Sequence, residues 1–413
     1  MVSQLAHVTI CWCGVVSAYV VIVGISKFAT REACNRDFGM FNHLLASLGL
    51  MQVAWMMSGY EDIMNKAMVE INYGLIATAA TVTALRTYTR FVRGPEPKKV
   101  KMSGKVVIIT GSNTGVGYET AKSLVDMGAH VIMACRSEDK AKAAIASIME
   151  QLEAVRATIK MGSAPSVTGK MTFIKLDLSS LASVRQFVAD FKARKLGLDG
   201  LILNAGVMHA QRKMTPEGLE ANLAVNYLGN FLLTTQLLPK LKESPDARVL
   251  CVNSSLHKTP VAFRFEDPMF EKDYGLFTAY ANSKLALMMF AEELQHRLNR
   301  EKSTVIVNSA NPGIVMTEIS RDMGFFLKNG YAAFRPLLCL FLKQPRAGAF
   351  TSVFLMTTPS LRKSEHEKAQ GVGGLFMQDS EPVAFNPAVN VVKARKELWT
   401  LSEKLVSEPK KSR

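Results

Sequence analysis

The segment Lys105-Val-Val-Ile-Ile-Thr-Gly-Ser-Asn-Thr-Gly-Val-Gly117 joins a β-branched apolar run to a glycine-rich turn. Residues 105–110 have the composition of a short strand that is buried on both faces. A helical pattern of apolar residues begins directly after the turn. A strand, a glycine turn and a helix N-terminus can together bind a phosphate, because free backbone N–H groups and the helix dipole face the anion. The residues of this candidate phosphate-binding turn are Gly111, Ser112, Asn113, Thr114, Gly115, Val116 and Gly117.

The composition indicates a basic protein with membrane segments. Hydrophobic residues make up 48% of the 413-residue chain, and a formal net charge of +15 favours anionic lipid or a phosphorylated cofactor as partners. Nucleic acid is the least favoured partner, because no run of Lys and Arg is interleaved with aromatic residues. The six cysteines lack metal-ligand spacing, so we expect free thiols in a reducing compartment and no metal site.

The first 93 residues contain three stretches without a charged side chain, at 8–26, 38–60 and 71–85. As a helix, the first would extend about 28 Å, close to the hydrocarbon thickness of a bilayer. Lys and Arg are concentrated between the first two stretches and after the third, which predicts three spans with the rest of the chain in the cytosol. The second and third stretches are also compatible with interfacial or buried helices. We therefore expect residues 1–93 to be a membrane-anchoring helical region.

After residue 100, strand and helix patterns alternate, which predicts an α/β fold of Rossmann type with a doubly wound parallel sheet of about seven strands. We expect a linker at 94–102, this domain at 103–406, a flexible surface insertion within it at 156–170, and a basic tail at 407–413. The expected strands are 105–110, 130–135, 171–176, 200–203, 248–253, 304–309 and 375–378. The expected helices after the first are 139–152, 183–193, 219–241, 278–299 and 391–406.

Several residues of chemical interest lie at or just beyond the ends of expected strands, where parallel sheets bind ligands. A glycine turn taken alone is weak evidence, because an ordinary turn between strand and helix has the same composition. The agreement among six strand ends is stronger evidence, and it indicates a dinucleotide site. The residues are Gly111, Arg136, Asp177, Asn204, Ser255 and Pro312.

Two of these residues bear on the cofactor. Arg136 stands where an acidic residue would bind the ribose 2′-OH of NAD, and an arginine can pair with a 2′-phosphate. We therefore expect NADP(H) to be preferred and NAD(H) to be possible, although a solvated surface arginine would give the same sequence. Asp177 is compatible both with a contact to the adenine amino group and with a cap on the next helix.

Tyr280 and Lys284 lie four residues apart, on one face of an expected helix. A tyrosine with its ordinary pKa near 10 is a poor base at neutral pH. A neighbouring ammonium group, helped by an oxidised nicotinamide, would lower that pKa and permit proton transfer. Ser255, just beyond an expected strand, has a hydroxyl that can bond a substrate oxygen. Each of these patterns also occurs on ordinary helix surfaces and turns.

Taken in order, these motifs resemble the short-chain dehydrogenase/reductases over about residues 103–406. The resemblance implies that Tyr280 is the general acid/base, that Lys284 lowers its pKa and binds the nicotinamide ribose, and that Ser255 orients the carbonyl. Ser254 is a possible rival, but the family places the catalytic serine second in this pair. Asn226 would hold a water in the proton relay. Residues implied to lie beside the cofactor are Asn204, Ala205, Gly206, Tyr280, Lys284, Pro312, Gly313 and Thr317.

Three further phrases, Ala-Cys-Arg136, Ser-Ser-Leu-His257 and Leu-Trp-Thr-Leu-Ser402, resemble the retinol dehydrogenase branch of that family. Three others, Leu241-Lys-Glu-Ser, Ser283-Lys-Leu-Ala-Leu and Pro345-Arg-Ala-Gly-Ala-Phe350, resemble its polyprenol dehydrogenase type. The resemblance implies an enzyme of lipid metabolism that interconverts a lipid alcohol and its aldehyde or ketone. The apolar segment 323–342 lies where the family has a variable substrate lid, although a helix packed on the core is nearly as compatible.

Two other functions are compatible with the sequence, a steroid or xenobiotic carbonyl reductase and a non-catalytic, cofactor-sensing scaffold on the same fold. The chain ends in Lys410-Lys411-Ser412-Arg413, which resembles a dilysine retrieval signal. We therefore expect the membrane of the endoplasmic reticulum, with the catalytic domain facing the cytosol. The sequence predicts no particular oligomeric state.

Overall fold

The computed structural model describes residues 94–158, 169–315, 342–361 and 373–407, together with Gly74 and Thr81. Most of them belong to one compact unit that takes in Arg93–Lys328 and Lys343–Arg413. Several parts of the chain for which predictions were made lie outside the described residues. They are Thr317, residues 323–341, residues 410–413 and the three uncharged stretches, of which only Gly74 and Thr81 are described. The predictions made for them stay predictions. Within the described ranges, no helix is both long and apolar enough to cross a membrane.

The centre of the unit is an eight-stranded sheet with the order β3-β2-β1-β4-β5-β6-β7-β8. All neighbouring strands are parallel except β7 and β8, which form an antiparallel hairpin. The predicted doubly wound parallel sheet is confirmed, with the short β8 as an eighth strand. The strands are β1 (Val106–Thr110), β2 (His130–Cys135), β3 (Lys170–Lys175), β4 (Gly200–Leu203), β5 (Arg248–Val252), β6 (Ile306–Asn311), β7 (Phe376–Gln378) and β8 (Glu381–Pro382).

The central strands are buried on both faces. Every residue of β1, β4 and β5 is buried. Ile108 belongs to one hydrophobic core, while Val107 and Ile109 belong to the other. Because alternate side chains of a strand face opposite sides, a strand between two cores is apolar throughout. The strand order reverses where β1 and β4 lie side by side, and such a switch point is where these folds bind ligands.

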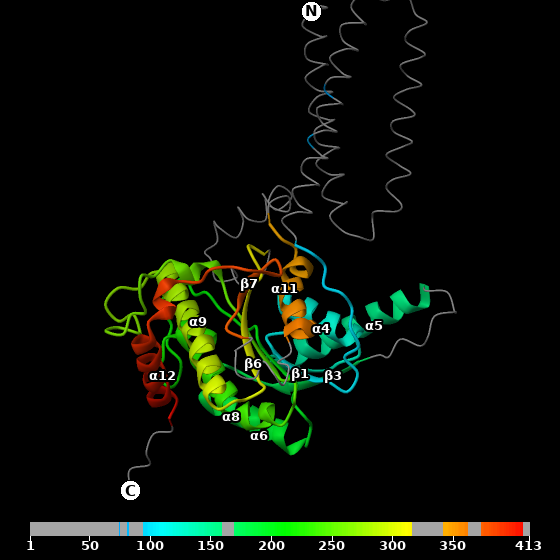
Figure 1. Ribbon diagram of the computed structural model, residues 1–413, viewed down its shortest axis with the longest axis horizontal. Helices are drawn as coiled ribbons and strands as arrows, with labels where there is room; N and C mark the ends of the chain where they lie inside the picture. The colour runs from blue at the N-terminus through cyan, green and yellow to red at the C-terminus, as the bar shows by residue number, and fades with distance from the viewer. Residues whose placement is uncertain are drawn as a thin grey trace, which may run out of the picture. The chain divides into compact units, whose positions relative to one another are not determined.

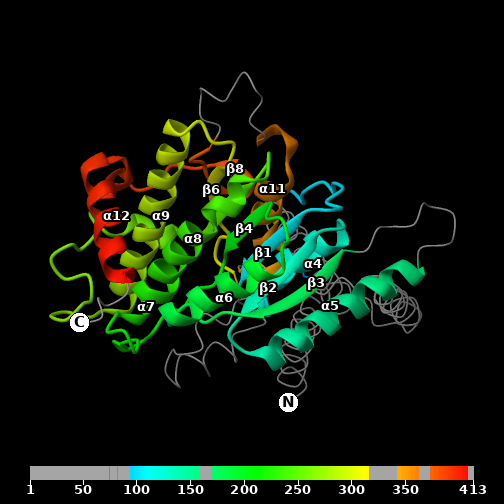
Figure 2. The same ribbon diagram turned by 90° about the horizontal axis from the view of Figure 1, so that it is seen from below.

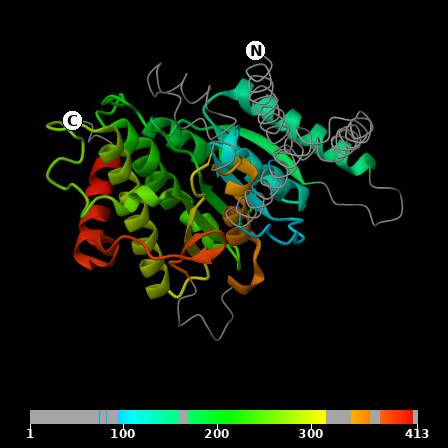
Figure 3. The same ribbon diagram turned by 90° about the horizontal axis from the view of Figure 1, so that it is seen from above.

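Helices cover the two faces of the sheet in separate groups (Figures 1 and 2). One face carries α4 (Gly115–Asp126), α5 (Glu138–Thr158) and α11 (Pro345–Thr357), whose apolar side chains share a core. The other carries α6 (Leu181–Ala193), α8 (Gly229–Lys242), α9 (Leu276–Arg300) and α12 (Val392–Val406). The helices α9 and α12 lie side by side (Figure 3). The sequence had not predicted α11.

Two other predictions need correction. The helix expected at 219–241 is divided into α7 (Ala221–Leu223), a π-helical turn (Ala224–Leu228) and α8. The helix α5 continues to Thr158, so the insertion expected from residue 156 begins later. Residues 153–158 include Glu, Ala and Arg, which favour helix, and Glu138 and Asp139 stabilise the first turn of α5 through the helix dipole.

Candidate functional site

The glycine turn after β1 has the backbone conformation that the sequence suggested. Gly111 and Gly115 have φ angles of 64° and 62°, which favour glycine over any residue with a side chain. Gly117 lies against β4, since a Cβ there would come within 2.4 Å of the Asn204 Nδ2. The side chain of Thr114, the residue before α4, makes no capping hydrogen bond. The first N–H groups of α4 are therefore not capped by that side chain and can bind an anion.

Two predicted members of this turn point their side chains inward. Ser112 is fully buried, and its hydroxyl donates to the Ile109 carbonyl at 3.0 Å. Val116 is also buried. Ser112 and Val116 can therefore contact a ligand only through the backbone, whereas Asn113 and Thr114 are partly exposed.

The end of β4 supports the turn from the neighbouring strand. Asn204 Nδ2 donates to the carbonyls of Thr110 and Gly111 at 2.9 and 3.1 Å. The Thr110 hydroxyl accepts from the backbone N–H groups of Asn204 and Ala205, both at 2.9 Å. A Cβ on Gly111 would lie only 2.9 Å from the Ala205 Cα, so the two segments are in close contact. Gly206 follows, partly buried.

Arg136 and Asp177 lie at the ends of the two outer strands of this half of the sheet. Arg136 is exposed, and its guanidinium has no ion-pair or hydrogen-bond partner among the described residues. Asp177 Oδ1 accepts from the backbone N–H and the hydroxyl of Ser179 at 3.0 and 2.6 Å. Asp177 therefore holds the turn before α6, but the cap of that helix is Ser180, whose hydroxyl accepts from the Ser183 N–H, so the expected cap at Asp177 is wrong. Its contact with adenine stays a prediction.

Pro312 and Gly313 follow β6 at the same edge of the sheet. Gly313 has a φ of 79°, and its N–H donates to Asn311 Oδ1 at 3.1 Å. The next residue, Ile314, is strongly exposed. Thr317, the last predicted cofactor contact, lies outside the described residues.

Tyr280 and Lys284 are both buried, 6% and 3% exposed, on the face of α9 that packs on β5. The Lys284 Nζ donates to the Val252 carbonyl at 3.0 Å. The same nitrogen lies 5.8 Å from the centroid of the Tyr280 ring. The predicted neighbourhood of these two side chains is therefore present.

The serine that hydrogen bonds to Tyr280 is Ser254 and not Ser255, whose predicted catalytic role stays untested. Ser254 and Tyr280 share a side-chain hydrogen bond, whereas Ser255 is exposed. The physical reason is the short 3-10 helix Ser255–Lys258 that follows β5. Ser254 caps it, with its hydroxyl accepting from the Leu256 N–H at 3.3 Å, so its side chain faces the protein and that of Ser255 faces out.

His257 holds this turn, and the sequence analysis had given it no role. The ring is fully buried, with Nδ1 2.6 Å from the Ser254 carbonyl oxygen. Nε2 lies 3.3 Å from the backbone nitrogen of Asn386 and must accept from it. The network therefore assigns the proton to Nδ1, which donates to Ser254. Burial lowers the pKa of His257, which favours this neutral form.

The pKa values in the site differ from the expected ones. Burial raises the pKa of Tyr280 to about 12, and within the described part of the chain its hydrogen bond with Ser254 acts in the opposite direction. Burial lowers the pKa of Lys284 to about 8. The protein's own groups thus keep Tyr280 protonated near pH 7, and the lowering of its pKa that was expected from Lys284 is not found among the described residues. A neutral phenol in this position can donate a proton.

Asn226 lies in the π-helical turn, and its side chain is fully engaged by the protein. Nδ2 donates to the Val207 carbonyl and the Ser283 hydroxyl, both at 2.9 Å, and Oδ1 accepts from the Val207 N–H at 2.8 Å. The side chain therefore joins the segment after β4 to α9, next to Lys284. The prediction that Asn226 holds a water stays untested.

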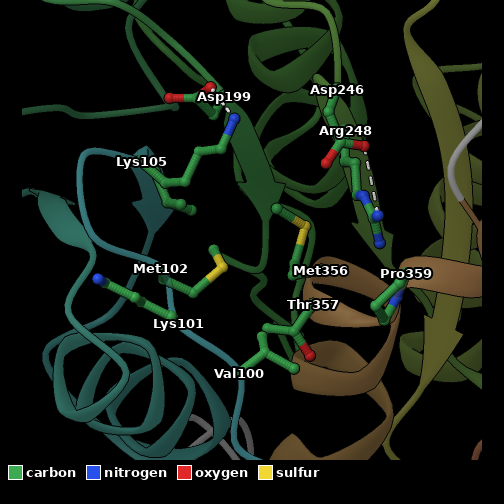
Figure 4. Close-up of a pocket in the computed structure, with 11 residues that line it drawn as sticks. Val100, Lys101, Met102, Lys105, Asp199, Asp246, Arg248, Met356, Thr357 and Pro359 are labelled. Carbon is green, nitrogen blue, oxygen red and sulfur yellow. Dashed lines mark hydrogen bonds and ion pairs between the residues drawn. The ribbon is translucent and has the colours of Figure 1, made fainter.

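A small cavity lies at the opposite edge of the sheet, where β1, β4 and β5 begin (Figure 4). Lys105 and Asp199 form an ion pair of 2.9 Å there, and Arg248 pairs with Asp246 at 3.4 Å. None of the predicted site residues lines this cavity. Among the described residues, no group of three or more His, Cys, Asp and Glu side chains could hold a metal ion.

Comparison with known proteins gives consistent similarities. A family model described as short chain dehydrogenase matches residues 105–324. Polyprenol dehydrogenase from Homo sapiens is 35% identical over 311 residues, 74% of this chain and 86% of the relative. Retinol dehydrogenase 14 from Mus musculus is 37% identical over 310 residues, with the same two coverages. A crystal structure of an uncharacterised protein from Mycobacterium paratuberculosis has a TM-score of 0.56 and 28% identity, covering 76% of this chain and 97% of that one.

Proposed function

This chain belongs to the short-chain dehydrogenase family and is an oxidoreductase, and we propose that it interconverts a lipid alcohol and its aldehyde or ketone with NADP(H). One observation carries the proposal. The buried phenol of Tyr280 hydrogen bonds to Ser254 at the carboxyl edge of the sheet, with the Lys284 ammonium beside it. The uncapped helix N-terminus of α4 follows β1 at the same edge.

The pKa of Tyr280 suits the reductive direction. Near pH 7 the phenol is neutral, and it would donate its proton to the carbonyl oxygen of the substrate. Ser254 would donate a hydrogen bond to the same oxygen and so stabilise its developing negative charge. Bound NADPH would supply a hydride to the carbonyl carbon. Alcohol oxidation needs the phenolate, which the positive charge of Lys284 would favour.

The residues at the carboxyl edge fit a phosphorylated dinucleotide. The positive φ angles of Gly111 and Gly115 open the turn before α4, and the uncapped N–H groups there would bind the pyrophosphate. Arg136 is exposed and unpaired among the described residues, so it is available for a 2′-phosphate. These features support a preference for NADP(H) over NAD(H).

Two observations support a lipid substrate taken from a membrane. The relatives with 35% and 37% identity are a polyprenol dehydrogenase and a retinol dehydrogenase, both named for lipid alcohols. Gly94, which continues from the hydrophobic N-terminal region, lies beside Asp379 at the carboxyl edge of β7. We extend the proposal to an endoplasmic reticulum membrane, with residues 103–406 in the cytosol. Protection of these residues from protease added to intact microsomes would overturn that orientation.

The test is NADPH oxidation by the full chain in detergent with retinal, polyprenal, dolichal and steroid ketones. We expect turnover of one lipid aldehyde, with a lower KM for NADPH than for NADH. Tyr280→Phe should reduce this turnover at least about 10³-fold without weakening NADPH binding, because only the transferable proton is lost. Cofactor binding without turnover of any carbonyl would overturn the proposal and favour a scaffold. Equal activity on water-soluble carbonyls would favour a xenobiotic reductase.

A further inference from the structure

We propose that the ion pair of the buried Lys343 with the partly exposed Asp379 is a positioning device for the Pro312–Gly313 turn, and that the extended segment 94–102, here called the strap, supports it from outside. The inference rests on the proposed function, in which this turn borders the nicotinamide. It adds residues from three distant parts of the sequence to the site. None of them was predicted to have a role.

The strap runs along the α4 and α11 side of the unit (Figure 3). At its start, a Cβ on Gly94 would lie 3.1 Å from the Asp379 Cα, and the φ of Gly94 is 70°. Further on, Glu96 pairs with Arg346 of α11 at 2.5 Å. Lys99 pairs with Asp126 at the end of α4, also at 2.5 Å. The strap is therefore attached at both edges of the sheet, and its first residue contacts Asp379.

Asp379 and Ser380 form the two-residue turn between β7 and β8. Their φ angles are 57° and 64°, which is the conformation of a type I′ hairpin turn. Asn-Gly and Asp-Gly are favoured sequences for such a turn, so Asp379 suits its position, whereas Ser380 stands where a glycine is usual. The carboxylate of Asp379 is also used. Here it forms an ion pair with the Lys343 ammonium.

Lys343 is buried against the Pro312–Gly313 turn. It is 6% exposed, and its backbone N–H donates to the Ile314 carbonyl at 2.9 Å. Its Nζ lies 3.1 Å from the position of a Cβ on Gly313, so the ammonium occupies the space beside that glycine. A buried ammonium is unfavourable unless it is paired, and Asp379 supplies the partner. The turn is thus fixed by Asn311 on one side and by Lys343 on the other.

Loss of the Asp379 carboxylate would leave a buried charge without its partner. Lys343 would then move toward solvent, and the space beside Gly313 would open. Because the turn would border the nicotinamide, we expect the hydride donor to be misplaced rather than the proton donor. A displacement of about 1 Å can lower a rate by about 10²-fold.

The experiment compares Asp379→Asn, Lys343→Met and the double variant with wild type, all as the full chain in detergent. Gly94→Ala removes no charge, but its methyl group would crowd Asp379 and its φ of 70° would strain the start of the strap. Lys105→Met is the matched control, because it removes an ion pair at the opposite edge of the sheet (Figure 4). The measurements are NADPH Kd by fluorescence, kcat, KM for the aldehyde, and the isotope effect with NADPH deuterated at the transferred hydride.

We expect both single variants to weaken NADPH binding about 3- to 10-fold and to increase the isotope effect, with KM for the aldehyde little changed. The double variant should bind NADPH at least as tightly as Lys343→Met does, because neither charge is then left unpaired. The inference would be overturned if the variants kept the wild-type NADPH Kd and isotope effect and lost only as much thermal stability as Lys105→Met does. If wild type turns over no carbonyl, the proposed function fails, while NADPH Kd still tests the ion pair.

Discussion

Ser254 and Tyr280 are joined by a side-chain hydrogen bond, whereas the side chain of the adjacent Ser255 is exposed. The bond crosses from the end of β5 to the first turns of α9, and among the described residues it is the interaction of Tyr280 that lowers its pKa against the effect of burial. It therefore affects both the position and the acidity of the phenol. A substrate oxygen within reach of one hydroxyl would also be within reach of the other.

The first prediction concerns the choice between the two serines. We expect Ser254→Ala to lower kcat about 10²-fold, because it removes a hydrogen bond to the substrate oxygen and one to Tyr280. Ser255→Ala should retain near wild-type kcat, since its hydroxyl faces solvent. Steady-state kinetics with the accepted aldehyde provide the measurement. A loss confined to Ser255→Ala would restore the serine that the sequence had favoured.

The second prediction assigns a positioning role to His257. Its Nδ1–H holds the Ser254 carbonyl, and its ring packs edge-on against Phe376, 4.8 Å between centroids. We expect His257→Phe to keep much of this packing and to lower kcat about 10-fold, with NADPH Kd unchanged. His257→Asn should recover most of the rate, because its amide nitrogen can replace Nδ1 as the donor.

A merely structural role for His257 would give a different result. Phe and Asn variants would then differ in melting temperature rather than in kcat. Equal kcat for His257→Phe and His257→Asn, at whatever level, would contradict the positioning role. When Ser254→Ala and His257→Phe are combined, the loss of kcat should be smaller than the product of the two single losses, because both changes act on one hydroxyl.

The central strands β1, β4 and β5 were predictable because each is buried between two hydrophobic cores and is mostly apolar. The strand ends then indicated the edge of the sheet that carries Arg136, Asn204 and Tyr280, since parallel strands share one carboxyl edge. The interruption at Ala224–Leu228 was not predictable. A π turn shifts the helical repeat by one residue, and the apolar residues on both sides still match a helix.

The rest of the site depends on tertiary contacts that spacing does not encode. The choice between Ser254 and Ser255 follows from a 3-10 helix that turns successive side chains to opposite sides. The pKa of Tyr280 follows from its burial, which a pattern of Tyr and Lys does not reveal. Lys343 and Asp379 are separated by a stretch of sequence of which a part lies outside the described residues. Their pairing becomes visible only when β6 and β7 lie together.

The third prediction concerns the cofactor. We expect Arg136→Ala to weaken NADPH binding about 10- to 100-fold, because it removes charged hydrogen bonds to the 2′-phosphate. NADH binding should change less than about 2-fold, since NADH lacks that phosphate. Fluorescence titration with both nucleotides measures the ratio. A parallel loss for both would mean that Arg136 contacts a part of the cofactor common to them, or only supports β2.

The last prediction concerns stability and pH. Folding lowers the pKa of Lys284 from its ordinary value of 10.5 to about 8, so between these values the unfolded chain binds more protons than the folded one. The free energy of unfolding should therefore rise with pH across this window, and the penalty is fully present below pH 8. Lys284→Met removes the penalty. At pH 7 we expect a gain of about 2 kcal/mol, after about 1 kcal/mol is lost with the hydrogen bond to Val252.

Denaturant unfolding in detergent between pH 7 and pH 9 measures this difference. The measurement stops at pH 9 because the pKa values of Cys251 and Tyr280 are both raised to about 12. Above pH 9, these two groups make the free energy of unfolding fall as pH rises. The gain of Lys284→Met over wild type should shrink as pH rises, while activity is low throughout. Lys105→Met, which removes the ion pair with Asp199 at the opposite edge of the sheet, is the control variant. Parallel pH profiles for wild type and Lys284→Met would mean that the ammonium is already solvated in the folded protein.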